Sequence, residues 1–223
     1  EEFSTIRAAD FLSDVVVDRL HAKEVYLGKG FAFGHNREGN IDLLTRMGDQ
    51  LGFVAGEVPE VKLRGCRVSS SKIRQLLAAG QVNLARRMLG RPYGVEGRVE
   101  RGSERGHKLG FPTANLHPHN RVIPRNGVYV TGTLIDGQWR RSVTNVGLRP
   151  TFADATEPSV ETYVMNWDGD LYGDVVRVRF LYRLRDERKF SSIEQLKTQI
   201  MIDVDRANSY FERAGTKHML AVI

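Results

Sequence analysis

The hydrophobic pattern of the chain changes from a helical period to a period of two after Gly90-Arg91-Pro92. Beyond this point short segments alternate apolar and polar residues, as half-buried strands do. We therefore expect two domains, at 1–90 and 91–223. Several short strands at this spacing predict that the second is an antiparallel barrel or sandwich. The strands are expected over residues 93–101, 127–135, 140–146, 160–167 and 176–185.

Local signals refine this second domain. Asp136-Gly137 has the composition of a hairpin turn between two of the strands. In the strand over 176–185 the arginines are expected on one face, with Phe180 and Tyr182 on the other. Ser191 and Glu194 form a capping-box pattern, so we expect a final helix that ends at Gly215. Its apolar stripe would comprise Ile193, Leu196, Ile200, Val204, Ala207 and Phe211.

The first ninety residues alternate helical segments with short apolar runs, which is typical of an α/β unit. We expect strands at 25–27 and 53–55 and a helix from Ile41 to Leu51. Ser69-Ser70-Ser71 predicts the start of another helix, and Gly90 the end of a helix over 82–89. A first helix is expected over residues 2–20, with Phe3, Ile6, Phe11, Val15 and Val16 on its buried side.

Composition limits the cellular compartment of the protein and the kinds of partner that it can bind. Thirty-three Lys and Arg against 27 Asp and Glu give a net charge of +6, which favours anionic partners. The single cysteine, Cys66, excludes a disulfide framework and suits a reducing cytoplasm. No apolar run approaches the ~20 residues of a membrane helix. No signal peptide opens these 223 residues. We expect a cytoplasmic protein with no membrane partner.

The segment 97–115 carries the clearest chemical signal. Its glycines let backbone N–H groups approach an anion, and successive amides can cradle a phosphate. His107 and Lys108 would add positive charge there, and the Thr113 hydroxyl and Asn115 amide oxygen suit Mg²⁺. On the glycine count alone, a hairpin with a solvated charged tip remains the alternative. The residues expected to bind ATP are Gly97, Gly102, Gly106, His107, Lys108, Gly110 and Pro112.

The run Gly106-His107-Lys108-Leu109-Gly110-Phe111-Pro112-Thr113-Ala114-Asn115 resembles the signature of riboflavin kinases. Further blocks of that family's pattern follow in order at 127–129, 145–152, 160–162, 171–173 and 184–190. The resemblance implies a six-stranded antiparallel barrel with a C-terminal helix. It also implies Mg²⁺ held beside ATP by Thr113 and Asn115, and Glu161 as the base that activates riboflavin for conversion to FMN.

Two assignments keep their alternatives. From the residues alone, a solvent-facing carboxylate on an alternating strand is the preferred interpretation of Glu161, and the family pattern reverses that preference. Arg185 is a candidate to guide a flavin or a phosphate, and the alternative is a solvated arginine on a basic strand face. The oligomeric state is left open by the sequence.

The first ninety residues resemble the second half of the FMN adenylyltransferase domain of bifunctional riboflavin kinase/FMN adenylyltransferases. The resemblance implies a remnant of a Rossmann-like nucleotidyltransferase domain. Phe31 and Phe33 match the flavin-side loop, and Ser70, Ser71 and Arg74 match a motif that meets the ATP phosphates at a helix start. Gly30 departs from the family's polar residue, and the family's His-x-Gly-His motif is absent from these 223 residues. We therefore expect FMN formation without FAD formation.

Two other functions compete with the kinase. FMN adenylylation as the main activity is one. The other is a non-catalytic basic barrel that binds RNA, supported by Arg177, Arg179, Arg183 and Arg185. Such a barrel needs exposed aromatic residues beside its arginines. Because Phe180 and Tyr182 are expected on the opposite face, we expect small-molecule substrates and no nucleic-acid partner.

Overall fold

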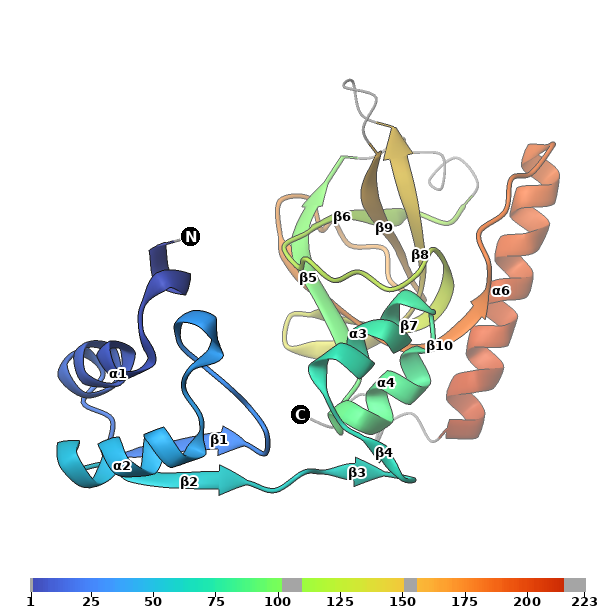
Figure 1. The fold of residues 1–223 in the computed structure, drawn as a ribbon. Helices are drawn as coiled ribbons and strands as arrows, with labels where there is room; N and C mark the ends of the chain where they lie inside the picture. Colours follow the sequence, from blue (N-terminus) through green and yellow to red (C-terminus); the bar gives the residue numbers. More distant parts are fainter. Residues whose placement is uncertain (1, 102–109, 151–155, 215–223) are drawn as a thin grey trace. The chain divides into compact units, whose positions relative to one another are not determined.

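The computed structural model describes residues 2–101, 110–150 and 156–214 and divides the chain into two compact units, 1–67 and 68–223 (Figure 1). Helices α3 and α4, which lie between residue 68 and the barrel, belong to the second unit. The domain boundary expected at Gly90-Arg91-Pro92 stays a prediction. Within the described residues, every helix is too short or too polar to span a bilayer.

The first unit has the expected α/β pattern. Strands β1 (Glu24–Gly28) and β2 (Val54–Val58) pair in parallel, and helix α2 (Ile41–Leu51) connects them. The Asn40 side chain caps α2 by accepting from the Leu43 N–H, and Gly52 ends it in the left-handed conformation (φ 79°). The short helix η3 (His35–Arg37) and the hairpin of β3 (Lys62–Leu63) and β4 (Cys66–Arg67) complete this unit.

The single helix expected over residues 2–20 is wrong. The segment instead forms the 3₁₀ turn η1 (Glu2–Thr5), the short helix α1 (Ala8–Asp10) and the π-helix η2 (Phe11–Arg19). The backbone between η1 and α1 forms hydrogen bonds with the segment 35–38. The Ile6 carbonyl accepts from His35 N, and the Ala8 N–H donates to Glu38. These bonds to a distant loop replace helical ones. The buried residues are consequently Ala8, Leu12 and Val16, and Phe3 is exposed.

Two short helices open the second unit. Ser69 caps α3 (Ser70–Ala78) through its hydroxyl, which accepts from Lys72 N, and α4 (Val82–Leu89) ends at Gly90 with φ 72°. Both helices lie at one end of the barrel (Figure 1). Their apolar side chains join the barrel's interior cluster, which includes Leu76, Leu77, Val82, Ala85, Val95, Leu116, Val146, Val160 and Val178.

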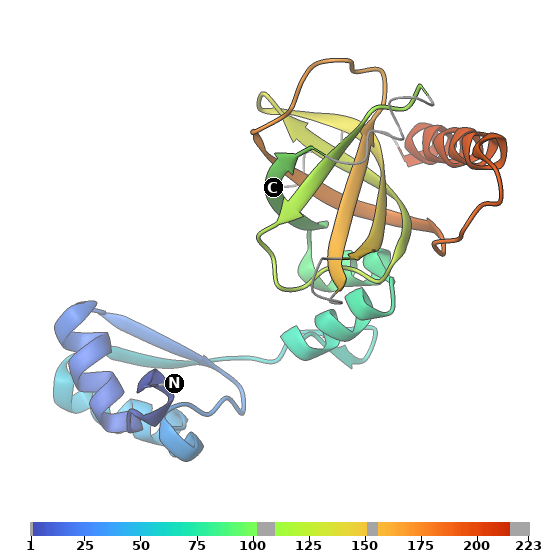
Figure 2. The ribbon, with the colours of Figure 1, turned by 90° about the horizontal axis from the view of Figure 1, so that it is seen from above.

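The strands form a closed antiparallel barrel in the order β10-β5-β6-β9-β8-β7, as expected (Figure 2). Asp136 and Gly137 both have positive φ and make the expected tight turn between two strands. Strand β6 was not anticipated, because its sequence does not alternate cleanly. The strands are β5 (Tyr93–Glu100), β6 (Thr113–Pro118), β7 (Gly127–Ile135), β8 (Gln138–Pro150), β9 (Thr156–Val164) and β10 (Val175–Arg185).

Helix α6 (Ile193–Ala214) packs on the outside of the barrel (Figure 2). Ala207 and Phe211 bury against an outer cluster with Val128, Val143 and other strand residues. Its cap is one residue later than expected: Ser192 Oγ accepts from Gln195 N, because the helix starts at Ile193. Ile193 is therefore 65% exposed and does not belong to the apolar stripe. The expected stop at Gly215 lies outside the described residues.

The placement of Tyr182 opposite the arginines is also wrong. The register of β10 shifts between Phe180 and Tyr182, so Phe180 stays in the interior and Leu181 turns into the outer cluster. Tyr182 is 45% exposed and stacks on Tyr210 of α6, with ring centroids 5.6 Å apart. A β-bulge inserts an extra residue and thereby breaks the alternation on which the expectation rested.

Candidate active site

A single register row crosses the barrel and carries the candidate residues. Asn115 of β6 pairs with Glu161 of β9. Glu161 also pairs with Asn145 of β8, the strand on the other side of β9. Asn145 pairs with Val128 of β7, which pairs with Arg185 of β10. Residues directly opposite in an antiparallel sheet point to the same face. These side chains therefore form one row, called here the site row.

The site row lies on the outer face of the barrel. The chain neighbours Leu116, Val146 and Val160 belong to the interior cluster, and strand neighbours alternate between faces. Val128, a member of the row, packs instead in the outer cluster with residues of α6. The row thus runs around the barrel wall across five of its six strands, and α6 packs next to its Arg185 end.

Thr113 and Asn115 share this outer face, because they are two residues apart on β6. Asn115 is 5% exposed, and its Nδ2 lies 3.5 Å from the Thr113 carbonyl. Phe111 packs edge-on against Tyr163, the partner of Thr113 in β9, with ring centroids 5.3 Å apart. A hydroxyl and an amide oxygen are hard donors that fit Mg²⁺ when phosphate and water complete its shell. The donor set of these two residues therefore fits the expected ion.

Glu161 is half-buried on this outer face, and both of its interpretations stay predictions. Ser159, two residues earlier on the same face, donates a hydrogen bond from Oγ to Glu161 Oε1 at 3.3 Å. With Asn115 on one side and Asn145 on the other, the carboxylate is flanked by polar groups on both neighbouring strands. A half-buried carboxylate held in this way can accept a proton from a substrate hydroxyl.

Arg185 is not a solvated surface arginine. Its side chain is 17% exposed, and its guanidinium forms an ion pair with Asp203 of α6 at 2.8 Å. Its Nη1 also donates to the Asp186 carbonyl at 3.0 Å. The alternative of a freely solvated arginine is therefore wrong, whereas its role toward a flavin stays a prediction.

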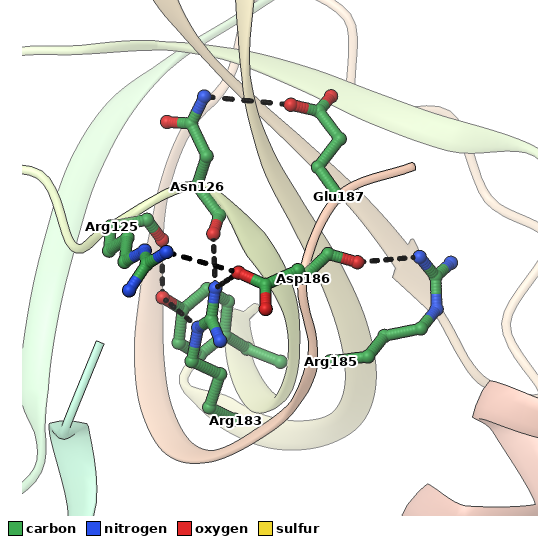
Figure 3. Close-up of polar contacts among 7 residues, drawn as sticks. Arg125, Asn126, Arg183, Arg185, Asp186 and Glu187 are labelled. Atoms are coloured by element: carbon green, nitrogen blue, oxygen red, sulfur yellow. Dashed lines mark hydrogen bonds and ion pairs between the residues drawn. The ribbon is translucent and has the colours of Figure 1, made fainter. Parts of the chain in front are cut away.

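A polar cluster surrounds the end of β10 next to Arg185 (Figure 3). The Arg183 guanidinium donates to Asp186 at 2.7 Å and to the Asn126 carbonyl at 2.5 Å. Arg125 forms a second ion pair with Asp186 at 3.5 Å. Hydrogen bonding to Arg183, followed by the charge of that guanidinium, lowers the pKa of Asp186. The cluster thus fixes the segment that follows Arg185.

The glycine-rich segment is described only in part. Gly102, Gly106, His107 and Lys108 lie outside the described residues. Gly110 has a φ of 83°, which favours glycine, and Pro112 is exposed. Their contact with ATP stays a prediction.

Gly97 lies within β5 and not in a loop. A side chain there would collide with the backbone carbonyl of His117 on β6, so close packing of two strands already requires a glycine. Its contact with ATP stays a prediction.

The candidates for adenylylation fall in different units. In the first, Phe31 is 57% exposed, whereas Phe33 packs against the core and pairs with Gly39. In the second, Ser70 and Ser71 are exposed at the start of α3, and Arg74 Nη2 lies 3.4 Å from Ser71 Oγ. Their binding roles stay predictions.

Sequence reasoning missed Asn145 and Asp203. Asn145 stands in one of the family-like blocks, but only the strand register shows that it flanks Glu161. Asp203 lies on the buried side of α6 among apolar positions, and a charged residue in an otherwise apolar stripe was the available signal.

Comparison with known proteins agrees with the fold. The family model described as riboflavin kinase matches residues 89–211, and the one described as FAD synthetase matches residues 1–72. The chain is 39% identical over 209 residues to a bifunctional riboflavin kinase/FMN adenylyltransferase of Pseudomonas fluorescens, covering 94% of the chain and 67% of the relative. The Escherichia coli K12 protein of the same description is 36% identical over 210 residues, with the same coverage.

A solved structure described as a macrolide-efflux protein from Streptococcus pneumoniae matches with a TM-score of 0.79 and 32% identity. It covers 93% of this chain and 67% of that one. The chain thus spans about two thirds of the length of these relatives. Its barrel domain and family matches define an ATP-dependent transferase. The chain belongs to the riboflavin kinase family, with a segment matching FAD synthetase ahead of the kinase domain.

Proposed function

We propose that the site row carries out the kinase reaction, with Glu161 as the base for the ribityl 5′-hydroxyl of riboflavin. The observation that supports this most is the placement of Glu161 between Asn115 and Asn145 on adjacent strands. As the 5′-oxygen bonds to the γ-phosphorus of ATP, Glu161 takes its proton. The bond from that phosphorus to the β–γ bridging oxygen breaks, so the products are FMN and ADP.

Thr113 and Asn115 would hold Mg²⁺ at the end of the row nearest the glycine-rich segment. Bound there beside the triphosphate, the ion supplies neutralisation of charge on the phosphoryl oxygens. The two side chains orient that charge relative to Glu161, which faces Asn115 across the strands. Positioning of this kind provides most of the rate in phosphoryl transfer.

The flavin would extend along the row toward Arg185. Three strand spacings separate β9 from β10, a path of about 14 Å along the curved barrel wall at ~4.8 Å per spacing. A riboflavin whose ribityl end lies at Glu161 would thus bring its ring system toward Arg185. Val128 lies between them in the row and is buried in the outer cluster with α6.

A second proposal concerns FMN adenylylation. The FAD synthetase match over residues 1–72 supports a contribution of Phe31, Phe33, Ser70 and Ser71 to that activity in a longer parent. Because these 223 residues contain no His-x-Gly-His motif, they should form FMN and no FAD.

Nucleic-acid binding has little support. Arg177 pairs with Glu96 at 2.6 Å, and the Arg179 guanidinium lies 4.1 Å from the Trp139 ring centroid. Arg183 and Arg185 pair with Asp186 and Asp203. All four arginines that suggested RNA binding are therefore engaged within the protein. We retain small-molecule partners and, on the single cysteine, a cytoplasmic location as proposals.

The test is to incubate the chain with riboflavin, ATP and Mg²⁺ and to separate the flavins formed. We expect FMN and no FAD. Formation of FAD from added FMN would instead support adenylylation by this chain. Absence of both products, with salt-sensitive retention of RNA, would favour the binding barrel.

A further inference from the structure

Asp203 is a buried carboxylate on α6 that accepts hydrogen bonds from two nitrogens of one barrel arginine, Arg185. It is 2% exposed. Arg185 Nε lies 2.9 Å from Oδ2 and 3.1 Å from Oδ1, and Arg185 Nη2 lies 2.8 Å from Oδ2. Gln199, one helical turn earlier, donates from Nε2 to Oδ1 at 2.8 Å. Three nitrogens thus donate to the carboxylate, and the guanidinium plane is fixed by two of them.

This contact determines which donors of Arg185 remain available. A guanidinium has five N–H groups. The N–H on Nε and one N–H on Nη2 donate hydrogen bonds to Asp203. One N–H on Nη1 donates to the Asp186 carbonyl. Toward the part of the chain that the structure describes, one N–H on each terminal nitrogen remains. Asp203 also balances the charge of Arg185, so the pair as a whole presents directed donors without a net charge, which suits an uncharged ligand that carries acceptor oxygens.

The same network continues to a hollow beside α6. Gln199 accepts a hydrogen bond from Arg188, and both residues line a hollow of about 470 Å³ with Phe190. The Arg185 guanidinium lies 5.8 Å from the Phe190 ring centroid. Asp203 therefore anchors a set of side chains that extends from the Arg185 end of the site row to a concave surface of ligand size.

We propose that Asp203 is a positioning residue, which holds Arg185 so that its two remaining N–H groups meet acceptor oxygens of the flavin substrate. This inference rests on the proposed function, because it takes riboflavin as the ligand of the site row. It adds a residue of α6 to the determinants of flavin affinity, acting through Arg185 and without touching the reacting atoms.

The test compares Asp203→Asn with Arg185→Gln and with the double variant. Asp205→Asn, the same chemical change at an exposed position of α6, is the matched control. Riboflavin binding is measured by flavin fluorescence, the two KM values by steady-state kinetics, and folding by thermal unfolding. We expect Asp203→Asn to raise the Kd and KM for riboflavin about tenfold, with the KM for ATP within twofold of wild type. The double variant should bind riboflavin no more weakly than Arg185→Gln alone.

A folded Asp203→Asn variant with unchanged riboflavin affinity would overturn the proposal, and so would additive losses in the double variant. If Asp203→Asn does not fold, Asp203→Glu keeps the charge and displaces the guanidinium by one methylene. It should weaken riboflavin binding, and unchanged binding in that variant would equally overturn the proposal. If the wild-type chain binds riboflavin but forms no FMN, the kinase function fails while the binding data still decide the role of Asp203. A wild-type chain that does not bind riboflavin overturns both.

Discussion

Asn115 and Glu161 lie directly opposite each other on the neighbouring strands β6 and β9. The two residues are 46 positions apart in sequence (161 − 115), and only closure of the barrel brings them together. An amide that fits a metal and a carboxylate that fits a base thus share one face of one sheet. This relationship links the expected ion to the expected proton acceptor, and it is the basis of the first two predictions.

Replacing Glu161 by Gln should abolish FMN formation without unfolding the barrel. The amide keeps the size of the side chain but cannot accept the hydroxyl proton, so kcat should fall by about 10²–10⁴. Glu96→Gln, at a surface ion pair on β5, is the matched control and should leave kcat unchanged. Turnover of the folded Glu161→Gln variant within twofold of wild type would remove Glu161 from the reaction.

Substitution of Thr113 by Val should raise the Mg²⁺ concentration needed for half-maximal activity, and Asn115→Ala should do the same. Each change removes one oxygen donor. We expect a shift of about tenfold or more, since loss of even an outer partner of a metal site changes affinity by that much. Thr45→Val, at an exposed hydroxyl on α2, controls for the change in side-chain chemistry. An unchanged Mg²⁺ dependence in both variants would place the ion elsewhere.

The elements that could be predicted are those whose signals are local. Helix α2 begins and ends at the expected residues because Asn40 caps it and Gly52 ends it. The hairpin at Asp136-Gly137 follows from two residues that tolerate positive φ. Glu161 and Asn115 were predicted through family resemblance, whereas Asn145 was missed because strand register is a long-range property.

The failures have equally specific causes. Tyr182 is exposed because a bulge in β10 interrupts the alternation, and no residue in that strand signals a bulge. The first helix breaks at Arg7 because hydrogen bonds from the Ile6–Ala8 backbone to a loop some thirty residues away outcompete helical ones. In both places tertiary contacts override local propensity.

Gly97→Ala should destabilise the barrel. A methyl group there meets the backbone of His117 and Pro118, which cannot move as a flexible side chain can. Overpacking of this kind costs about 1–3 kcal/mol, measured by urea unfolding. Gly94→Ala on the same strand, where the nearest atom is the Val178 carbonyl oxygen at 3.2 Å, should cost less. A folded Gly97→Ala protein with a raised KM for ATP would support a phosphate-binding role in addition.

Asp186→Asn should lower stability at neutral pH and have a smaller effect in acid. In the folded protein the pKa of Asp186 lies below its ordinary value of 3.8, chiefly because of the hydrogen bond from Arg183 and the charge of that arginine, with a smaller contribution from Arg125. A carboxyl whose pKa is lowered by folding stabilises the folded state above its unfolded pKa. That contribution is lost as the pH falls through the folded value.

The measurement is the difference in melting temperature between wild type and Asp186→Asn from pH 7 to pH 3. The difference should be constant down to about pH 5 and then shrink, because the wild-type carboxyl becomes protonated. It should also shrink at high salt, since Asp186 is exposed and its ion pairs with Arg183 and Arg125 are screened. Asp168→Asn, at an exposed loop position, controls for loss of one negative charge. A difference that stays constant from pH 7 to pH 3 would show that Asp186 acts through hydrogen bonding that survives its protonation.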